Sequence, residues 1–268
     1  MPELPEVENV VRSIGTDFKF PLVINKFQFL RKDLRWSFPQ AQLRALEGQS
    51  ILKLHRRAKY ILFTTKDFTI ISHLGMTGQW ITSPLKPQLK KHDHLVVEFA
   101  KKSLVYNDPR RFGFVQVVAN NKIEKYFSAV GVEPFAELSV ETLQKIKKSD
   151  RAIKNVLMDQ KIVVGIGNIY ASEALFRAKI KPQTLARLLS VNRIKQLYHF
   201  ADEILAEAIA AGGSSISNYL NAQKQKGAFQ QRHLVYDREG EPCKICGTEI
   251  SRLVQIGRST FWCKTCQK

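Results

Sequence analysis

Apolar residues near the start of the chain recur at a helical period. Pro2 and Glu6 are ordinary residues for a helix start, and Gly15 is a suitable C-terminal stop. The apolar positions between them share one helical face: Leu4, Val7, Val10, Val11 and Ile14. The pattern therefore predicts an amphipathic helix that begins near Pro2 and buries this face.

Short runs of β-branched and aromatic residues follow, separated by Gly, Pro, Asp and Asn. The runs are residues 23–30, 60–63, 68–71, 94–99 and 114–118. Their spacing predicts antiparallel strands packed as a β-sandwich or a flattened barrel.

The pattern changes at residues 131–134 (Gly-Val-Glu-Pro), which we interpret as a domain boundary. Helical spacing then covers 142–148, 152–158, 168–177 and 192–211, where Gly212 and Gly213 stop the last helix. Short strands return after Phe229. We therefore expect an α+β, multidomain chain: an N-terminal helix with a β-sandwich over 1–131, a helical domain over 132–228 and a cysteine-rich domain over 229–268.

The charge balance narrows the class of partner. The 268 residues include 42 Lys and Arg against 24 Asp and Glu, a formal charge of +18. Such an excess favours a polyanionic partner, most simply nucleic acid, over charge kept only for solubility. An anionic membrane surface is a weaker alternative, because no basic amphipathic helix or lipidation signal supports it. With no secretory signal and no apolar run of about 20 residues, we expect a cytoplasmic protein without a membrane partner.

All four cysteines lie near the C-terminus in two Cys-x-x-Cys pairs, Cys243 with Cys246 and Cys263 with Cys266. This spacing predicts a zinc ribbon with one tetrahedral Zn²⁺. Four thiolates leave no open coordination position, so the zinc should be structural. Residues 255–260 should form the tip of a hairpin between the pairs. Arg258 there is either a phosphate contact or a solvated turn residue.

The N-terminus also carries candidate chemistry. If Met1 is removed, Pro2 presents a secondary amine that can attack a carbonyl-type carbon, and Glu3 beside it can donate a proton. The positive end of the predicted helix disfavours the ammonium form and makes the amine a better nucleophile. Glu6 lies one helical turn further on. The simpler interpretation, a helix start with no catalytic role, is compatible with this one.

Three further motifs are ambiguous when taken singly. Residues 165–170 (Gly-Ile-Gly-Asn-Ile-Tyr) fit either an anion site at a helix start or an ordinary turn. Loops 73–78 and 107–113 each place a bulky residue, Met76 or Phe112, among glycines. These side chains either pack in the core or wedge into DNA where a base has left the stack. The basic cluster at residues 56–59 is either a solvated face or a phosphate contact.

Together these motifs resemble bacterial formamidopyrimidine-DNA glycosylase over essentially the whole chain. The resemblance rests on residues 1–8, the lysine strand at 56–60, loops 73–78 and 108–113, a helix–two-turns–helix element at 165–173 and a zinc finger at 243–266. It implies a bifunctional DNA glycosylase and AP lyase for base excision repair. Such an enzyme excises 8-oxoguanine and formamidopyrimidines from duplex DNA and acts on abasic sites. It is expected to be a monomer associated with the bacterial nucleoid.

The resemblance also implies roles for individual residues. Pro2 would attack C1′ and form a Schiff base that leads to β,δ-elimination, Glu3 would assist base departure, and Glu6 would support the site. Lys59 would hold a phosphate near the lesion. Met76, Arg110 and Phe112 would fill the void, with Arg110 on the widowed cytosine. The other implied DNA contacts are His92, Lys154, Asn168 and Arg258.

Two departures and two rival interpretations matter. Residues 214–229 correspond to the family's lesion-capping loop, but Ala228 stands where an aromatic residue is expected, and Ala58 replaces a common glycine. An endonuclease VIII-type enzyme for oxidised pyrimidines is disfavoured by Leu4 and by loop 108–113. A non-catalytic zinc-ribbon protein that binds nucleic acid would have no need of the Pro2-Glu3 pair.

Overall fold

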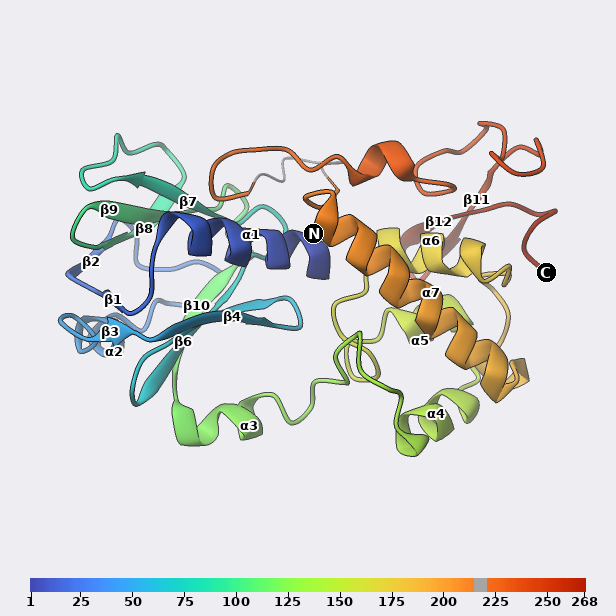
Figure 1. Ribbon diagram of the computed structural model, residues 1–268, viewed down its shortest axis with the longest axis horizontal. Helices are drawn as coiled ribbons and strands as arrows, with labels where there is room; N and C mark the ends of the chain where they lie inside the picture. The colour runs from blue at the N-terminus through green and yellow to red at the C-terminus, as the bar shows by residue number, and fades with distance from the viewer. Residues whose placement is uncertain (215–220) are drawn as a thin grey trace. The chain divides into compact units, whose positions relative to one another are not determined.

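The computed structural model describes residues 1–214 and 221–268. It divides into two compact units (Figure 1). The first comprises Met1–Ser128 and Ala211–Ala228, and the second comprises Ala129–Ala210 and Phe229–Lys268. Each unit is therefore built from two stretches of chain. The division at residues 131 and 228 stays a prediction about which segments fold as domains.

The first unit is an antiparallel β-sandwich with an N-terminal helix, which confirms the expected fold. Helix α1 spans Leu4–Asp17 and packs against strands from both sheets. One sheet has the order β10-β6-β5-β4, with bounds Phe114–Ala119, Phe68–His73, Tyr60–Thr64 and Lys53–Arg57. The other has the order β2-β8-β9-β7, with bounds Lys26–Phe29, Asp93–Glu98, Lys102–Asn107 and Gln79–Pro84.

Smaller elements complete this unit. They are β1 (Leu22–Val23), which pairs with β3 (Ser50–Ile51), the helices α2 (Gln40–Arg44) and α3 (Ile123–Tyr126), and a 3₁₀ turn at Asn120–Lys122.

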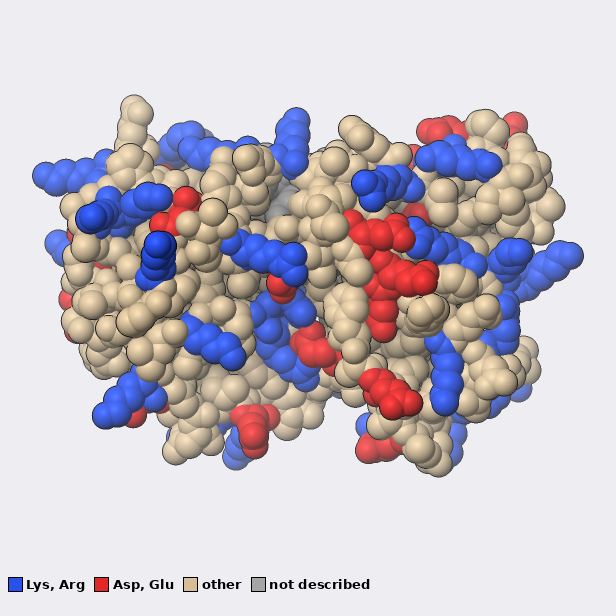
Figure 2. Space-filling view, in the orientation of Figure 1, with Lys and Arg blue, Asp and Glu red and all other residues tan. Residues whose placement is uncertain are grey.

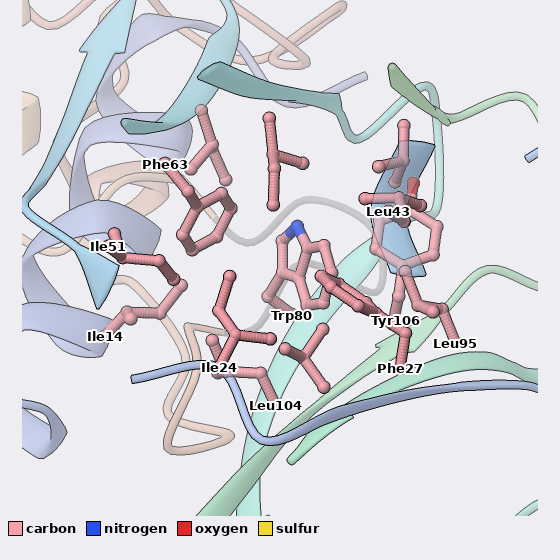
Figure 3. Close-up of a cluster of buried hydrophobic side chains, with 14 of the residues drawn as sticks. Ile14, Ile24, Phe27, Leu43, Ile51, Phe63, Trp80, Leu95, Leu104 and Tyr106 are labelled. Carbon is pink, nitrogen blue, oxygen red and sulfur yellow. The ribbon is translucent and has the colours of Figure 1, made fainter. Parts of the chain in front are cut away.

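The core of this unit lies between the two sheets and α1 (Figure 3). Trp80 is buried there, with its ring edge-to-face on Phe63 at 5.6 Å and on Tyr106 at 5.0 Å between centroids. The indole Nε1 donates to Ser72 Oγ at 2.9 Å, so the one polar atom of the ring is satisfied. The predicted apolar face of α1, including Leu4, is buried as expected.

Three strands of the two four-stranded sheets were not predicted from the sequence. Strands β4 and β7 are edge strands, and their outward residues are mostly polar, so neither forms an uninterrupted apolar run. Strand β9 is central and buried, but its apolar run is only Leu104–Tyr106, with polar residues at both ends. A short apolar run of this kind does not by itself identify a strand.

The second unit contains the expected helical region and zinc ribbon. Its helices are α4 (Val140–Lys147), α5 (Ile153–Leu157), α6 (Asn168–Arg177) and α7 (Val191–Ala210), with 3₁₀ turns at Ala186–Leu188 and Phe229–Arg232. Strands β11 (Ser251–Gln255) and β12 (Arg258–Trp262) form the ribbon hairpin. Ile256 and Gly257 form its two-residue tip, both with positive φ, as a tight hairpin turn requires.

A buried carboxylate joins α6 to the segment before the ribbon. Glu173 accepts backbone N–H bonds from Leu234, Val235 and Tyr236 at 2.8, 2.9 and 2.7 Å. Burial raises the pKa of Glu173, while the three N–H donors and nearby Arg177 oppose the rise. These bonds hold the chain on the helix where the ribbon begins, and the ribbon core continues onto Phe176.

Basic side chains are spread over the face drawn in Figure 2, whereas acidic ones gather over α7. There Arg177 pairs with Glu207 at 2.6 Å, and Glu203 pairs with His199 at 3.1 Å. Among the described residues, no helix is both long and apolar enough to cross a membrane.

Candidate active site

The N-terminal residues form a capped helix start. Glu3 precedes α1 in extended conformation, and its backbone N–H donates to Glu6 Oε2 at 2.8 Å, while its own carboxylate accepts from the backbone N–H of Glu6. Both carboxylates are buried. This reciprocal pair satisfies two N–H groups that a helix start otherwise leaves without partners. It also fixes the Glu3 carboxylate next to Pro2, as the catalytic interpretation requires.

Glu6 has a second structural partner. Its Oε1 accepts the backbone N–H of Ser214 at 2.8 Å. Gly213 adopts φ +84°, and a Cβ there would meet Glu6 Oε1 at 2.9 Å, so only glycine fits comfortably. Glu6 therefore joins the helix start to the first residues of the predicted capping loop. Residues 215–220 of that loop lie outside the described part of the chain.

The end of the same loop returns to the first unit. Ala222 is buried in the sandwich core, where its backbone N–H donates to Ser13 Oγ at 3.0 Å. Gln223 Nε2 donates to the carbonyl of Ser13 and to Asp17 Oδ2, both at 2.6 Å. The amide of Gln223 thus anchors the loop end on α1.

Lys59 lies in the two-residue turn between β4 and β5 and is buried. Ala58 before it adopts φ +53°, a region that favours glycine, although alanine occupies it here. Arg56 is not a free surface charge, because its Nε bonds Glu8 of α1 at 3.1 Å. The charge of Lys59 acts on His73. Burial lowers the pKa of the His73 imidazole to about 4, and the positive charges of Lys59 and Arg35 contribute to the shift.

A cleft of about 570 Å³ brings several candidate segments together. It is lined by Met1, Leu34, Arg35, His73, Gly75, Arg110, Arg111 and Phe112. The N-terminus and the two glycine-containing loops, which are far apart in sequence, thus border one space. Three of the lining side chains are arginines, so the cleft is suited to an anionic ligand.

The two loops also contact each other directly. A Cβ on Gly75 would collide with the backbone of Phe112, so the loops approach as closely as glycine allows. Met76 and Phe112 are 38% and 47% exposed, and the guanidinium of Arg110 lies 4.6 Å from the centre of the Phe112 ring. The core-packing alternative for Met76 and Phe112 is therefore wrong.

The remaining candidates occupy two places. His92 lies just before β8, and its carbonyl accepts the backbone N–H of Asp108 at 3.0 Å, next to the loop that carries Arg110. Lys154 and Asn168 belong to the second unit. Asn168 is the first residue of α6 and follows the capping residue Gly167.

Lys154 is only 1% exposed, and its ammonium group has three oxygen partners. They are Asn168 Oδ1 at 2.5 Å, Thr260 Oγ1 at 2.7 Å and the Ser259 carbonyl at 3.2 Å. The Asn168 amide in turn donates to the Ser259 carbonyl at 2.9 Å. This network fastens the turn before α6 to the ribbon hairpin, where Arg258 is exposed.

The four cysteine thiols fit a single zinc ion. Their sulfur atoms all lie within 4.8 Å of one another, with Cys246 and Cys263 at 3.4 Å and Cys243 and Cys266 at 3.9 Å. A tetrahedral site with Zn–S bonds of about 2.3 Å needs sulfur atoms about 3.8 Å apart. The ribbon therefore provides one structural, four-cysteine zinc site.

Sequence reasoning missed Arg35, Thr77 and the structural role of Asp108. Arg35 lies in the cleft, and its backbone N–H donates to the Gly113 carbonyl at 3.1 Å. Its neighbour Trp36 packs on Phe114 at 4.4 Å. Arg31, Lys32 and Arg35 beside Trp36 were an available signal for a nucleic-acid contact. Asp108 and Thr77 gave no such signal, because their importance depends on a contact between two loops.

The chain was compared with known protein families and their members. Residues 1–115 match the formamidopyrimidine-DNA glycosylase N-terminal domain, 130–219 its H2TH domain and 240–268 the zinc finger found in FPG and IleRS. The formamidopyrimidine-DNA glycosylases of Bdellovibrio bacteriovorus and Bartonella tribocorum are 45% and 41% identical to it, over the full length of both chains.

Solved structures agree with these matches. A Lactococcus lactis Fpg mutant in complex with Fapy-dG-containing DNA has a TM-score of 0.90 and 35% identity, covering all of both chains. The Lactococcus lactis Fpg in complex with abasic-site DNA has a TM-score of 0.89 and 34% identity, covering 99% of each chain.

The low pKa of His73 predicts a pH-dependent stability. An imidazole with a folded-state pKa of about 4 and an unfolded value of 6.5 contributes stability that is fully present above pH 6.5 and is lost as the pH falls towards 4. Urea unfolding measures the free energy of unfolding at pH 7 and at pH 4.5. We expect this free energy to fall between the two pH values by roughly 2 kcal/mol more in the wild type than in His73→Gln. His199→Gln is the control, because the His199 side chain is exposed on α7. An equal fall in the free energy of unfolding in the wild type and in His73→Gln would contradict the prediction.

Proposed function

Since the chain belongs to the formamidopyrimidine-DNA glycosylase family, we propose that it excises oxidised purines, 8-oxoguanine and formamidopyrimidines, from duplex DNA and then cleaves the abasic strand. The observation that carries the proposal is the capped N-terminus, in which the buried Glu3 follows Pro2 in sequence and Met1 lines a basic cleft. The relatives' complexes with Fapy-dG DNA and with abasic DNA support the same substrates.

The proposed reaction uses only groups of this chain and water. With Met1 removed, the Pro2 nitrogen attacks C1′ of the damaged nucleotide and forms a C–N bond, while the bond from C1′ to the base breaks and the departing base takes up the proton that the Pro2 nitrogen loses. Glu3 gives its proton to the ring oxygen as the C1′–O4′ bond breaks, and the product is an iminium (Schiff base). The iminium makes a C2′ proton acidic, so water removes it as β-elimination expels the 3′ phosphate, and loss of a C4′ proton then expels the 5′ phosphate by δ-elimination. Water finally hydrolyses the iminium and frees Pro2.

DNA binding would use both units. We propose that Lys59 and His92 bind phosphates from the first unit and that Asn168 and Arg258 do so from the second. Lys154 has its three hydrogen bonds filled by protein oxygens. We therefore propose that it acts by holding Asn168 and the ribbon hairpin in place and not as a direct phosphate ligand.

Met76, Arg110 and Phe112 are proposed to fill the space that the flipped nucleotide leaves. Met76 and Phe112 offer exposed apolar surface that can stack or wedge between base pairs. Arginine has only donors, and cytosine offers acceptors at O2 and N3, so Arg110 matches a widowed cytosine better than an adenine.

We also propose that the protein acts as a monomer in the bacterial cytoplasm, on nucleoid DNA. Analytical ultracentrifugation with and without a DNA duplex would test the first point, since one protein per duplex is expected.

The first prediction concerns the nucleophile. Borohydride should trap a covalent complex between the processed protein and abasic duplex DNA, because it reduces the iminium to a stable amine. An N-terminal extension should abolish trapping, whereas the same extension at the C-terminus should not. Efficient trapping by protein whose mass shows that Met1 is retained would contradict Pro2 as the nucleophile.

The second prediction separates the zinc from the phosphate contact beside it. Cys246→Ser should lose zinc and DNA affinity together, because removing a ligand unfolds a small metal module. Arg258→Ala should keep zinc, weaken binding by about tenfold and lower the salt slope by about one. Arg252→Ala is the matched control, since that arginine on the same hairpin already pairs with Glu239. Unchanged affinity in both Cys246→Ser and Arg258→Ala would contradict the proposal.

The third prediction concerns base flipping, which costs a few kcal/mol and least where pairing is already lost. Met76→Ala and Phe112→Ala should slow 8-oxoguanine excision about ten- to a hundredfold more than cleavage at a preformed abasic site. Arg110→Ala should lose the preference for lesions opposite cytosine over adenine. Single-turnover rates measure both effects. Equal losses on lesion and abasic DNA would mean that these residues serve only the fold.

A further inference from the structure

The carboxylate of Asp108 lies at the junction of the two loops that carry the wedge residues, and it is completely buried. Its Oδ1 accepts the Thr77 hydroxyl at 2.5 Å and the backbone N–H of Arg110 at 3.3 Å. Its Oδ2 accepts the backbone N–H of Gly113 at 2.9 Å. One buried acid thus binds the 73–78 loop and both sides of Phe112 at once.

Thr77 completes the junction from the other loop. Its hydroxyl oxygen donates to Asp108 and also accepts the backbone N–H of Arg110 at 3.2 Å. Thr77 directly follows Met76, and Arg110 is itself a wedge residue. The cross-link therefore lies within one or two residues of all three side chains that are proposed to enter DNA.

A second anchor holds this junction on the sandwich. The Tyr106 hydroxyl donates to the His73 carbonyl at 3.0 Å, and a Cβ on either Gly78 or Gly113 would collide with that hydroxyl. His94 Nε2 bonds the Asp108 carbonyl at 2.9 Å. The base of each loop is thus fixed on rigid strands, and the Thr77–Asp108 bond links the two loops to each other.

We infer that Thr77 and Asp108 are positioning residues that hold Met76, Arg110 and Phe112 as one preorganised wedge. The inference rests on the proposed function. Groups already fixed in the inserting geometry lose little conformational freedom when they enter the duplex, so the binding energy is available to offset unstacking. Neither residue needs to touch DNA, and yet both should control how well a base is flipped and how well its partner is read.

The test compares excision of 8-oxoguanine with cleavage at a preformed abasic site. Thr77→Val keeps the side-chain shape but removes the hydroxyl, so the loops lose their link. We expect the ratio of the two single-turnover rates to fall about tenfold, and the preference for cytosine over adenine opposite the lesion to fall with it, because Arg110 loses its fixed backbone. Thr77→Ser retains the hydroxyl and should restore both.

A matched control separates positioning from stability. Thr69→Val also removes a threonine hydroxyl of the first unit: Thr69 lies in strand β6, is buried, and donates to Asn120 Oδ1 at 2.8 Å. It should lower the melting temperature about as much as Thr77→Val does and leave the rate ratio and the opposite-base preference unchanged. If Thr77→Val folds poorly, the comparison is made between Thr77→Ser and Thr77→Ala. Only Thr77→Ala should then lower the ratio of lesion excision to abasic cleavage.

The coupling between the loops gives a second readout. When Thr77 is present, the effects of Met76→Ala and Phe112→Ala on the rate of lesion excision should not add in the double variant. In the Thr77→Val background, the two effects should add. The inference would be overturned if Thr77→Val had the same ratio of lesion excision to abasic cleavage as the wild type, or if Thr69→Val lowered that ratio as much as Thr77→Val does. A wild type that cleaves abasic DNA but no lesion, or neither substrate, would refute the proposed function and this inference with it.

Discussion

The structure depends throughout on buried carboxylates that accept backbone N–H groups of irregular segments. Glu6 binds the helix start and Ser214, Asp108 binds the wedge loops, and Glu173 binds the chain that leads into the ribbon. A buried carboxylate is costly unless hydrogen bonds replace its hydration. Each of these acids therefore specifies one conformation of a segment that has no regular hydrogen-bonding pattern of its own, and each segment carries or adjoins a candidate functional residue.

The burial and pairing of acidic side chains also affect the net charge of the surface. The chain has few acids for its many bases, and several of those acids are buried or paired with arginines, as Glu8 is with Arg56 and Glu207 with Arg177. On the face in Figure 2 the largest group of acidic side chains lies over α7, and basic side chains are spread over the rest of that face. A net positive field attracts DNA without sequence preference, which suits an enzyme that must search for rare damage.

Local patterns in the sequence predicted those structural features that depend on residues close together in the chain. The apolar period of α1 and the glycines after α7 were predicted correctly, because each follows from local backbone chemistry. A hairpin between the cysteine pairs was predicted too, but its tip is Ile256 and Gly257 and not the whole of residues 255–260. The fold class and the zinc site followed from the same kind of evidence. The edge strand β4 was not predicted because its mostly polar residues form no apolar run, and the bond from its Arg56 to Glu8 of α1 is a contact that no local pattern records.

The candidate site was predictable only in part. The residue types at Pro2 and Glu3 indicated chemistry, but the sequence could not decide between core and surface for Met76 and Phe112, which depends on how two distant loops meet. The buried state of Lys154 and the Thr77–Asp108 link are also products of long-range packing. Local sequence thus indicated candidate reactive groups, whereas tertiary structure determines how they are held.

The central claim is that the N-terminal amine at the capped start of α1 is the reacting atom. Peptide mapping by tandem mass spectrometry of a borohydride-reduced complex with abasic DNA tests it most directly. The account predicts the added sugar mass on the peptide that begins at Pro2, with the modification on its α-nitrogen. A modification on the side chain of Lys59, or of any other lysine, would contradict it.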